Sequence, residues 1–345
     1  MDERLAALQV WLREALDLAV ASIVPASGDA SFRRYFRVTV TGGRYIAMDA
    51  PPHLEDCRPF VAIAAAMAGF GLHVPRVHAQ DLTQGFLLLS DLGSQQYLSA
   101  LNERTADRLY GDAIAALVRL QSKGPVADDA LPPFDEARLA MEMGLFRDWF
   151  LRRHLGIELT DDDLGMLEAV FQRLIDNALA QPRVWVHRDY HSRNLMVTAD
   201  RNPGVLDFQD AVIGPVAYDL VSLLRDCYID WPEAAVRRWM ASYYRQAGEA
   251  GCLEGVAPAQ FRQWFDLMGV QRHLKAIGIF ARLNHRDGKP GYLGDIPRAL
   301  GYVRAVAAND RALVGLLRLI ETRVVPVVGA SPSPRPSRRG RRPYE

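Results

Sequence analysis

One segment of the chain decides its fold: residues 184–197, which read VWVHRDYHSRNLMV. The apolar residues at both ends predict short strands, and the polar residues between them predict a loop. A second segment, VLDFQD at residues 205–210, repeats the pattern, with an apolar pair leading into acidic residues. Asp189, Asn194 and Asp207 therefore lie at the ends of short strands, where polar side chains can face a cleft. We expect this strand–loop–strand arrangement to bring the three side chains together.

The three side chains supply the groups that phosphoryl transfer requires. The reaction needs a carboxylate that orients and deprotonates the acceptor hydroxyl, and oxygen ligands that hold Mg²⁺ on a nucleotide. We expect Asp189 to be the catalytic carboxylate. Asn194 and Asp207 offer the amide and carboxylate oxygens that Mg²⁺ prefers. Singly these are weak signals, since an isolated Asp is usually a turn former and His187 alone is more often a packed core histidine. The complete string predicts an ATP-dependent phosphotransferase.

The string resembles the H-x-D-x-x-x-x-N catalytic loop and metal-binding Asp turn of the protein-kinase-like fold. His191, two residues after Asp189, is similar to the aminoglycoside phosphotransferase family, whereas protein kinases usually carry lysine there. Residues 214–220, GPVAYDL, resemble the motif that follows the metal-binding Asp in that family. The resemblance covers most of the chain and implies ATP and Mg²⁺ as cofactors. It also implies structural roles for His187 and Asp219, with Asp219 bracing the catalytic loop.

Five shorter segments resemble one branch of that family, the bacterial anomeric kinases for N-acetylmuramate and N-acetylglucosamine. The segments are Ser31–Tyr35, Met48–Pro52, Leu206–Ala211, Leu224–Tyr228 and Gln271–Lys275. This resemblance implies that the acceptor is the anomeric hydroxyl of an amino sugar, in peptidoglycan recycling. Motifs report ancestry better than substrate. A kinase for another small hydroxyl acceptor, such as an aminoglycoside, choline or homoserine, therefore stays open.

The elements around these motifs predict an α+β fold with two lobes. Residues 1–92 form a strand-rich N-lobe that binds the nucleotide, with an N-terminal helix over about 2–20 and a strand over 32–40. Residues 93–325 form a larger helical C-lobe with the catalytic loop and the acceptor site. Residues 326–345, rich in Pro, Ser and Arg, form a disordered tail. We therefore expect a bilobal protein-kinase-like fold of the aminoglycoside phosphotransferase type.

The N-lobe departs from the kinase pattern at its phosphate-binding lysine. Met48 or Asp49 stands where that lysine is expected, and no lysine precedes Lys123. In one interpretation the protein is a nucleotide-binding module without activity. In the other, which we favour, Arg33 or Arg34 clamps phosphate oxygens in its place. A solvated strand face is the simpler explanation for each arginine taken singly.

Two more segments are candidates for nucleotide contacts. Backbone amides of residues 28–32 could cover phosphates, although the loop matches G-x-G-x-x-G poorly. Residues 89–92 resemble the interlobe hinge whose backbone would meet adenine. Glu55, which a kinase lysine would normally pair with, has no lysine partner in this part of the sequence. The predicted nucleotide contacts are Gly28, Ser31, Phe32, Arg33, Arg34, Ser90, Asp91 and Leu92.

The acceptor contacts are expected just after the helix that carries Asp219. Asp226 could hydrogen-bond sugar hydroxyls, and Trp231 could stack on a pyranose ring, although core packing is the simpler explanation for the aromatic residues. Basic residues outnumber acidic ones over residues 262–298, which suits a neutral or carboxylate-bearing acceptor better than a polycation. A solvated basic helix face would give the same balance. The predicted acceptor contacts are Arg225, Asp226, Tyr228 and Trp231.

Composition sets the remaining expectations. The 345 residues carry a net charge of +0, so no global field favours nucleic acid or an anionic membrane. Three widely spaced cysteines argue against a disulfide framework or a zinc site. We expect a cytoplasmic protein with a small-molecule amino-sugar substrate and no nucleic acid, membrane or obligate protein partner. An interaction protein that works through its Arg-rich tail is a further alternative. Oligomeric state, sugar preference and the identity of the replacing arginine stay open.

Overall fold

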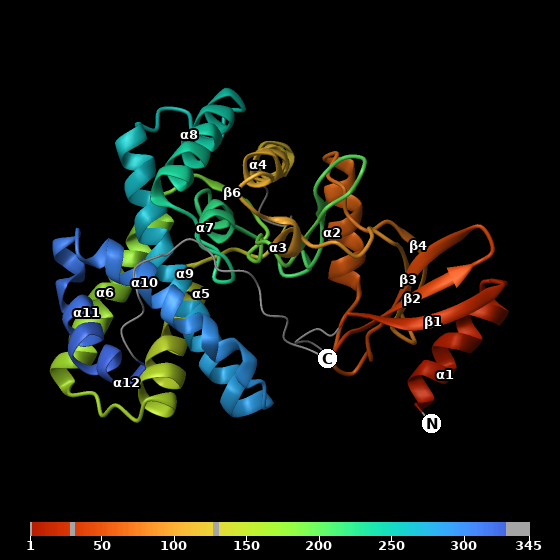
Figure 1. Cartoon of the computed structure of the whole chain (residues 1–345), viewed down its shortest axis with the longest axis horizontal. Helices are drawn as coiled ribbons and strands as arrows, with labels where there is room; N and C mark the ends of the chain where they lie inside the picture. Colours follow the sequence, from red (N-terminus) through yellow and green to blue (C-terminus); the bar gives the residue numbers. More distant parts are fainter. Residues whose placement is uncertain (1, 28–31, 127–130, 329–345) are drawn as a thin grey trace. The chain divides into compact units, whose positions relative to one another are not determined.

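The computed structural model describes residues 2–27, 32–126 and 131–328 (Figure 1). Gly28, Ser31 and most of the predicted tail therefore lie outside the described residues. Contacts divide the chain into two compact units, and unit 1 comprises Met1–Asn102 with Arg193–Ala211. Unit 2 comprises Glu103–Ser192 with Val212–Glu345.

The division differs from the predicted N-lobe, which ends at residue 92 and leaves out residues 193–211. Short β-bridges join this later segment to the first part of the chain, between His73 and Gly204 and between Gln96 and Met196. The Phe208 ring also packs on Phe60, with the ring centroids 4.9 Å apart. Residues 193–211 therefore belong with the strand-rich unit.

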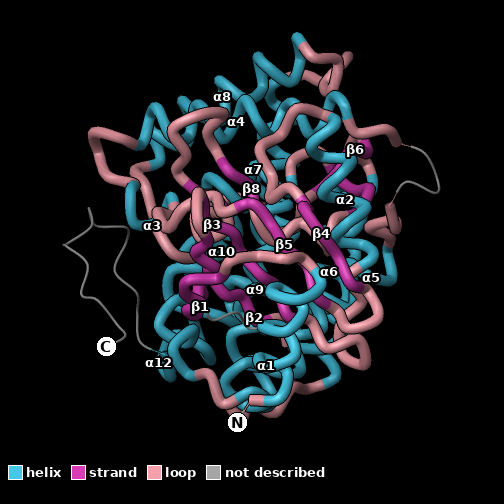
Figure 2. The backbone as a smooth tube through the Cα atoms, turned by 90° about the vertical axis from the view of Figure 1, so that its right-hand side faces the viewer, coloured by secondary structure: helices cyan, strands magenta, loops and turns pink. Residues whose placement is uncertain are grey.

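Unit 1 is built on a five-stranded antiparallel sheet with the order β1-β2-β3-β5-β4 (Figure 2, magenta). Its strands are β1 (Val20–Ser27), β2 (Arg34–Val40), β3 (Gly43–Asp49), β4 (Val77–Asp81) and β5 (Phe86–Ser90). The turn between β2 and β3 needs a positive φ, which Gly42 supplies at 90° without steric cost.

One face of this sheet is covered by the N-terminal helix α1 (Glu3–Val10), which continues as a π-helical turn over Trp11–Ala15. The buried cluster between them comprises Leu8, Trp11, Leu12, Phe36, Val38, Ala47, Phe86 and Leu88. The helical segment was expected to reach residue 20. It ends at Ala15, because the chain must turn before β1 begins at Val20. The other elements of unit 1 are α2 (Arg58–Gly69), α3 (Tyr97–Ala100), β7 (Leu195–Met196) and β8 (Gly204–Val205).

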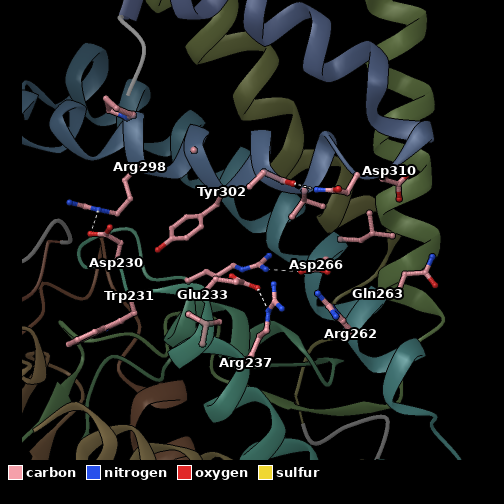
Figure 3. A pocket seen from close by; sticks show the side chains of 18 of the residues that line it. Asp230, Trp231, Glu233, Arg237, Arg262, Gln263, Asp266, Arg298, Tyr302 and Asp310 are labelled. Carbon is pink, nitrogen blue, oxygen red and sulfur yellow. Dashed lines mark hydrogen bonds and ion pairs between the residues drawn. The ribbon is translucent and has the colours of Figure 1, made fainter. Parts of the chain in front are cut away.

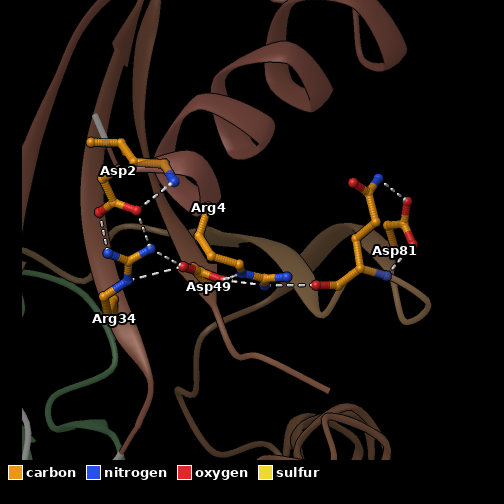
Figure 4. Close-up of polar contacts among 7 residues, drawn as sticks. Asp2, Arg4, Arg34, Asp49 and Asp81 are labelled. Carbon is orange, nitrogen blue, oxygen red and sulfur yellow. Dashed lines mark hydrogen bonds and ion pairs between the residues drawn. The ribbon is translucent and has the colours of Figure 1, made fainter. Parts of the chain in front are cut away.

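An ion cluster closes the α1 face of the sheet (Figure 4). Asp49 is fully buried and accepts hydrogen bonds from Arg4 Nε and Arg34 Nε, each at 3.0 Å. Arg34 also forms an ion pair with Asp2, which caps α1. Arg4 donates to the backbone oxygen of Gln84 at 2.7 Å. Arg34 and Asp49 therefore tie α1 to the sheet on this face.

Unit 2 is mostly helical, with one two-stranded ladder of β6 (Arg183–Val186) and β9 (Val212–Pro215). Its helices are α4 (Ala106–Lys123), α5 (Glu136–Leu145), α6 (Asp161–Leu179), α7 (Tyr218–Leu224), α8 (Glu233–Glu249), α9 (Pro258–Asp287), α10 (Ile296–Ala307), α11 (Val314–Leu319) and α12 (Val325–Val328). A π-helical segment, Phe146–His154, continues α5. The apolar pattern of residues 295–318 predicts one helix, but the structure has two, α10 and α11, because the chain turns at Asp310, whose side chain caps a short 3₁₀ turn.

Helix α9 is the central element of unit 2 and contacts α5, α6, α7 and α10. It begins with Pro258 in its first turn and ends at Gly288, which has a left-handed φ of 64°. A Cβ at Gly278 would lie 2.4 Å from the backbone carbon of Leu145, so only glycine allows this approach of α9 to α5. No helix of the described residues is both long and apolar enough to cross a membrane.

Candidate active site

The loop that follows β6 is held by a buried carboxylate. Asp219, in the first turn of α7, accepts backbone N–H bonds from His187 at 2.6 Å and Arg188 at 2.9 Å. Arg188 adopts a φ of 76°, which is costly for a residue other than glycine. The backbone N–H of Asp189 donates to His187 Nδ1 at 3.3 Å. Burial raises the pKa of Asp219 to about 6, against the opposing effect of His187 and the two amides. These contacts fix the loop conformation that presents Asp189.

Beside this loop lies a buried ion network that the sequence analysis missed. Glu142 of α5 is 2% exposed and forms ion pairs with Arg188 and with Lys275 Nζ, the latter at 3.3 Å. Gln271 Nε2 donates to the same carboxylate at 3.2 Å, and Lys275 also donates to the Tyr218 hydroxyl at 2.9 Å. Gln271 and Lys275 are four residues apart on α9, so the Gln271–Lys275 motif marks one helix face. This four-residue spacing was the sequence signal for the network, whereas no sequence motif singled out Glu142.

Asp189 lies in a field of positive charge. Burial alone would raise the pKa of its carboxyl group, but Lys275, His191, Arg272 and Arg188 lower it to about 2. The side chain is therefore a carboxylate over the whole physiological pH range. A carboxylate can accept a hydrogen bond from an acceptor hydroxyl, as a phosphotransferase requires.

The segment after α7 joins the catalytic loop through Asp226. Its two carboxylate oxygens accept backbone N–H bonds from Ser192 at 3.0 Å and Tyr228 at 2.9 Å. The ring of Tyr228 meets the His191 ring edge-on, with centroids 5.3 Å apart. Asp226 thus positions the catalytic loop, whether or not it also contacts an acceptor.

The other two predicted acceptor residues line a separate cavity of about 1030 Å³ (Figure 3). Arg225 forms an ion pair with Asp266 of α9 at 2.7 Å. Trp231 Nε1 donates to the Tyr110 hydroxyl at 2.8 Å. Asp189 is not among the residues that line this cavity. The four predicted acceptor residues therefore divide between two places in unit 2.

In unit 1 the predicted metal ligands lie next to one another on the β7–β8 hairpin. Asn194 Nδ2 donates to Asp207 Oδ2 at 3.2 Å, and Gln209 Nε2 donates to Asp207 Oδ1 at 2.7 Å. Asp207 has a left-handed φ of 62°, a strained conformation that often marks functional sites. Mg²⁺ commonly binds one or two carboxylates together with waters and substrate phosphates. This pair of oxygen donors fits such an ion.

The N-lobe arginines have different partners. Arg33 Nε forms an ion pair with Glu55 Oε2 at 3.1 Å, so Glu55 pairs with an arginine instead of a lysine. Arg34 lies on the α1 face with Phe36, whereas alternation along β2 places Tyr35 on the other face. Met48 is paired with Tyr35 and so shares that second face.

The remaining predicted nucleotide residues lie at the end of β5 and in the loop before β2. Asp91 pairs with Arg37, with an Nε–Oδ2 distance of 2.7 Å. Ser90 Oγ accepts the backbone N–H of Arg76 at 2.9 Å. The Phe32 side chain is 64% exposed. The predicted nucleotide contacts of these residues therefore stay predictions.

The burial of His191 predicts a pH dependence of stability. Burial lowers its pKa to about 4, although Asp226 and Asp189 act in the opposite direction. Between pH 6.5 and 4 the unfolded chain binds a proton that the folded chain does not, so the free energy of unfolding falls as the pH drops. The loss is about 2.5 kcal/mol by pH 4.5. Buried His273, whose pKa is also lowered, adds a loss of its own. Urea denaturation at pH 7 and 4.5 should therefore show a total loss in the wild type that exceeds the loss in His191→Asn by about 2.5 kcal/mol. Equal losses would contradict it.

The chain is similar to known phosphotransferases over most of its length. The sequence profile described as "Phosphotransferase enzyme family" matches residues 22–259. A protein of Pseudomonas putida named "N-acetylmuramate/N-acetylglucosamine kinase" is 50% identical over 329 residues, covering 92% of this chain and 96% of that protein. Proteins of the same name from Pseudomonas aeruginosa and Caulobacter vibrioides are 49% and 32% identical, covering 92% and 87% of this chain and 96% and 91% of those proteins.

Solved structures resemble the chain in fold. The choline kinase LicA from Streptococcus pneumoniae superposes with a TM-score of 0.63 at 12% identity, covering 87% of this chain and 99% of that one. An ADP-bound aminoglycoside phosphotransferase APH(2'')-Ib gives 0.56 at 17% identity, covering 88% and 98%. These likenesses confirm the predicted α+β fold of the protein-kinase-like, aminoglycoside phosphotransferase type.

Proposed function

The chain belongs to the phosphotransferase enzyme family, and on that premise we propose that it transfers the γ-phosphoryl group of ATP to the anomeric hydroxyl of N-acetylmuramate and N-acetylglucosamine. Its relatives named for these two sugars support the acceptor. The observation that carries the proposal is the hydrogen-bonded Asn194–Asp207 pair, whose members follow the ionised Asp189 by five and eighteen positions in the sequence. A cytoplasmic location, where ATP is supplied, is part of the proposal.

In the proposed reaction Asp189 accepts a hydrogen bond from the anomeric hydroxyl. The hydroxyl oxygen attacks the γ-phosphorus, the bond from phosphorus to the bridging oxygen of ADP breaks, and the hydroxyl proton moves to the Asp189 carboxylate. A carboxyl group with a pKa of about 2 is a weak base. Asp189 therefore mainly orients the hydroxyl, and the proton moves once the new bond has formed. Asn194 and Asp207 would hold Mg²⁺, which neutralises charge on the phosphates.

We further propose that Arg33 takes the place of the missing N-lobe lysine. Arg33 pairs with Glu55, the partnership that a kinase lysine normally makes, whereas Arg34 is bonded to Asp2 and Asp49 on the α1 face.

Paired variants test this choice. Arg33→Met should raise the KM for ATP about tenfold or more, because a charge-assisted bond to phosphate is lost. Arg34→Met should leave that KM nearly unchanged but lower the free energy of unfolding by about 1–3 kcal/mol, since buried Asp49 loses a partner. Steady-state kinetics and urea denaturation of both variants give the comparison. The reverse pattern would assign the phosphate to Arg34.

An acceptor panel tests the function itself. Purified protein with ATP and Mg²⁺ should phosphorylate N-acetylmuramate and N-acetylglucosamine, and should leave kanamycin, choline and homoserine unchanged, as mass spectrometry of the products can show. Turnover of one of the latter compounds alone would identify a different kinase. Stabilisation by ATP without transfer to any compound would indicate an inactive nucleotide-binding module.

A further inference from the structure

Arg272 of α9 is a buried cation that pairs with no carboxylate of the described residues. Its side chain is 5% exposed, and within residues 2–27, 32–126 and 131–328 it makes no ion pair. Its one hydrogen bond runs from Nη1 to the Cys227 sulfur at 3.6 Å, a weak acceptor. Its Nε atom is buried and has no hydrogen-bond partner among the described residues. Burying a guanidinium without a carboxylate is costly, so this position calls for an explanation.

The neighbouring cations, unlike Arg272, have carboxylate partners. Arg188 and Lys275 share the Glu142 carboxylate, and Arg225 pairs with Asp266. Three cations of this region thus pair with two carboxylates, and Arg272 forms no ion pair among the described residues. A guanidinium that forms no ion pair within the protein can use its charge and its N–H groups to bind a ligand. The planar fork of these N–H groups matches the geometry of a carboxylate.

The surroundings of Arg272 identify what it faces. Its charge lowers the pKa of Asp189 and acts on Asp226 and Cys227, so it lies beside the catalytic loop. Two further polar atoms there, His191 Nδ1 and Ser192 Oγ, are buried and have no hydrogen-bond partner in the described part of the chain. Unsatisfied buried polar groups beside a reacting carboxylate are typical of a polar ligand site.

We propose that Arg272 binds the lactyl carboxylate of N-acetylmuramate and so sets the preference of the enzyme between its two sugars. This inference rests on the proposed function. The lactyl group leaves the ring at C3, two carbons from the anomeric hydroxyl that Asp189 orients, so a residue beside Asp189 can reach it. N-acetylglucosamine has a hydroxyl at C3 and offers Arg272 no charge.

The two sugars make the test internally controlled. Arg272→Gln should lower kcat/KM for N-acetylmuramate by about 30-fold or more, the scale of a lost charge-assisted pair. The same variant should change kcat/KM for N-acetylglucosamine less than about threefold, because no carboxylate is involved. Arg272→Lys, which keeps the charge without the fork, should recover part of the loss. Arg318→Gln, an exposed arginine on α11, serves as the control and should leave both sugars unaffected.

A modified acceptor tests the inference without any variant. The wild type should phosphorylate N-acetylmuramate with an amidated carboxyl group about as poorly as Arg272→Gln phosphorylates the natural sugar, and Arg272→Gln should not distinguish the two forms. Equal turnover of both forms by the wild type would overturn the inference, even if the variants fail to fold. Equal losses on both sugars would overturn it as well, and would point to contact with the transferred phosphoryl group. If the wild type phosphorylates neither sugar, the proposed function fails and the inference falls with it.

Discussion

An Asp189→Asn variant is expected to lose about three orders of magnitude in kcat, while its KM for ATP changes little. Asparagine keeps the size of the side chain but loses the carboxylate charge that orients the hydroxyl and takes up its proton, and positioned acid–base groups contribute 10²–10⁴-fold, or about three orders of magnitude. The fold should survive, because Asp219 and His187 hold the loop through its backbone. Rapid-quench measurement of a single turnover isolates this step.

Asp200→Asn is the matched control for this change. Asp200 is exposed and lies eleven positions later in the same part of the chain. The control should keep wild-type kcat for both sugars. An Asp189→Asn enzyme that also keeps wild-type kcat would remove Asp189 from the reaction.

The second large effect is expected at Asp207. Asp207→Asn should lower kcat about 100-fold or more and raise the Mg²⁺ concentration needed for half-maximal rate, because a metal ion on phosphate contributes several kcal/mol. Asparagine is the informative replacement because it tolerates the left-handed φ of 62° at this position. The loss then reports the missing charge and not a disturbed backbone.

Asp210→Asn controls for a charge change near the hairpin. Asp210 is exposed and follows three residues later, so its substitution should leave the Mg²⁺ dependence unchanged. If Asp207→Asn shows the wild-type dependence on Mg²⁺, the ion is not held at Asp207.

The sequence was sufficient for the elements whose pattern is local. The strands on either side of the catalytic loop, the β2–β3 turn at Gly42 and most long helices follow from periodicity and turn residues. Strand β1, which contains Pro25, was not among the predicted strands. In the structure β1 is an edge strand, where a residue without an N–H is tolerated. Strand β4, at the other edge, alternates in burial but spans only five residues, of which two, Val77 and Ala79, are apolar.

The sequence could not reveal contacts between distant segments. Glu142 and Gln271 are 129 residues apart, and only the packing of α9 on α5 brings them together. Sequence periodicity could not decide whether Arg33 or Arg34 binds phosphate. The decision depends on their partners, Glu55 for Arg33 and Asp49 for Arg34, which come from other elements. That Arg272 forms no ion pair among the described residues was likewise invisible, since this can be recognised only once its neighbours are known.

Phosphorus–proton correlation NMR of the product tests the central claim most directly. After reaction of N-acetylmuramate with ATP, the account predicts a phosphorus resonance coupled to the anomeric proton of the sugar, and its absence with the Asp189→Asn enzyme. Coupling to the C6 protons, or release of inorganic phosphate alone, would contradict the account.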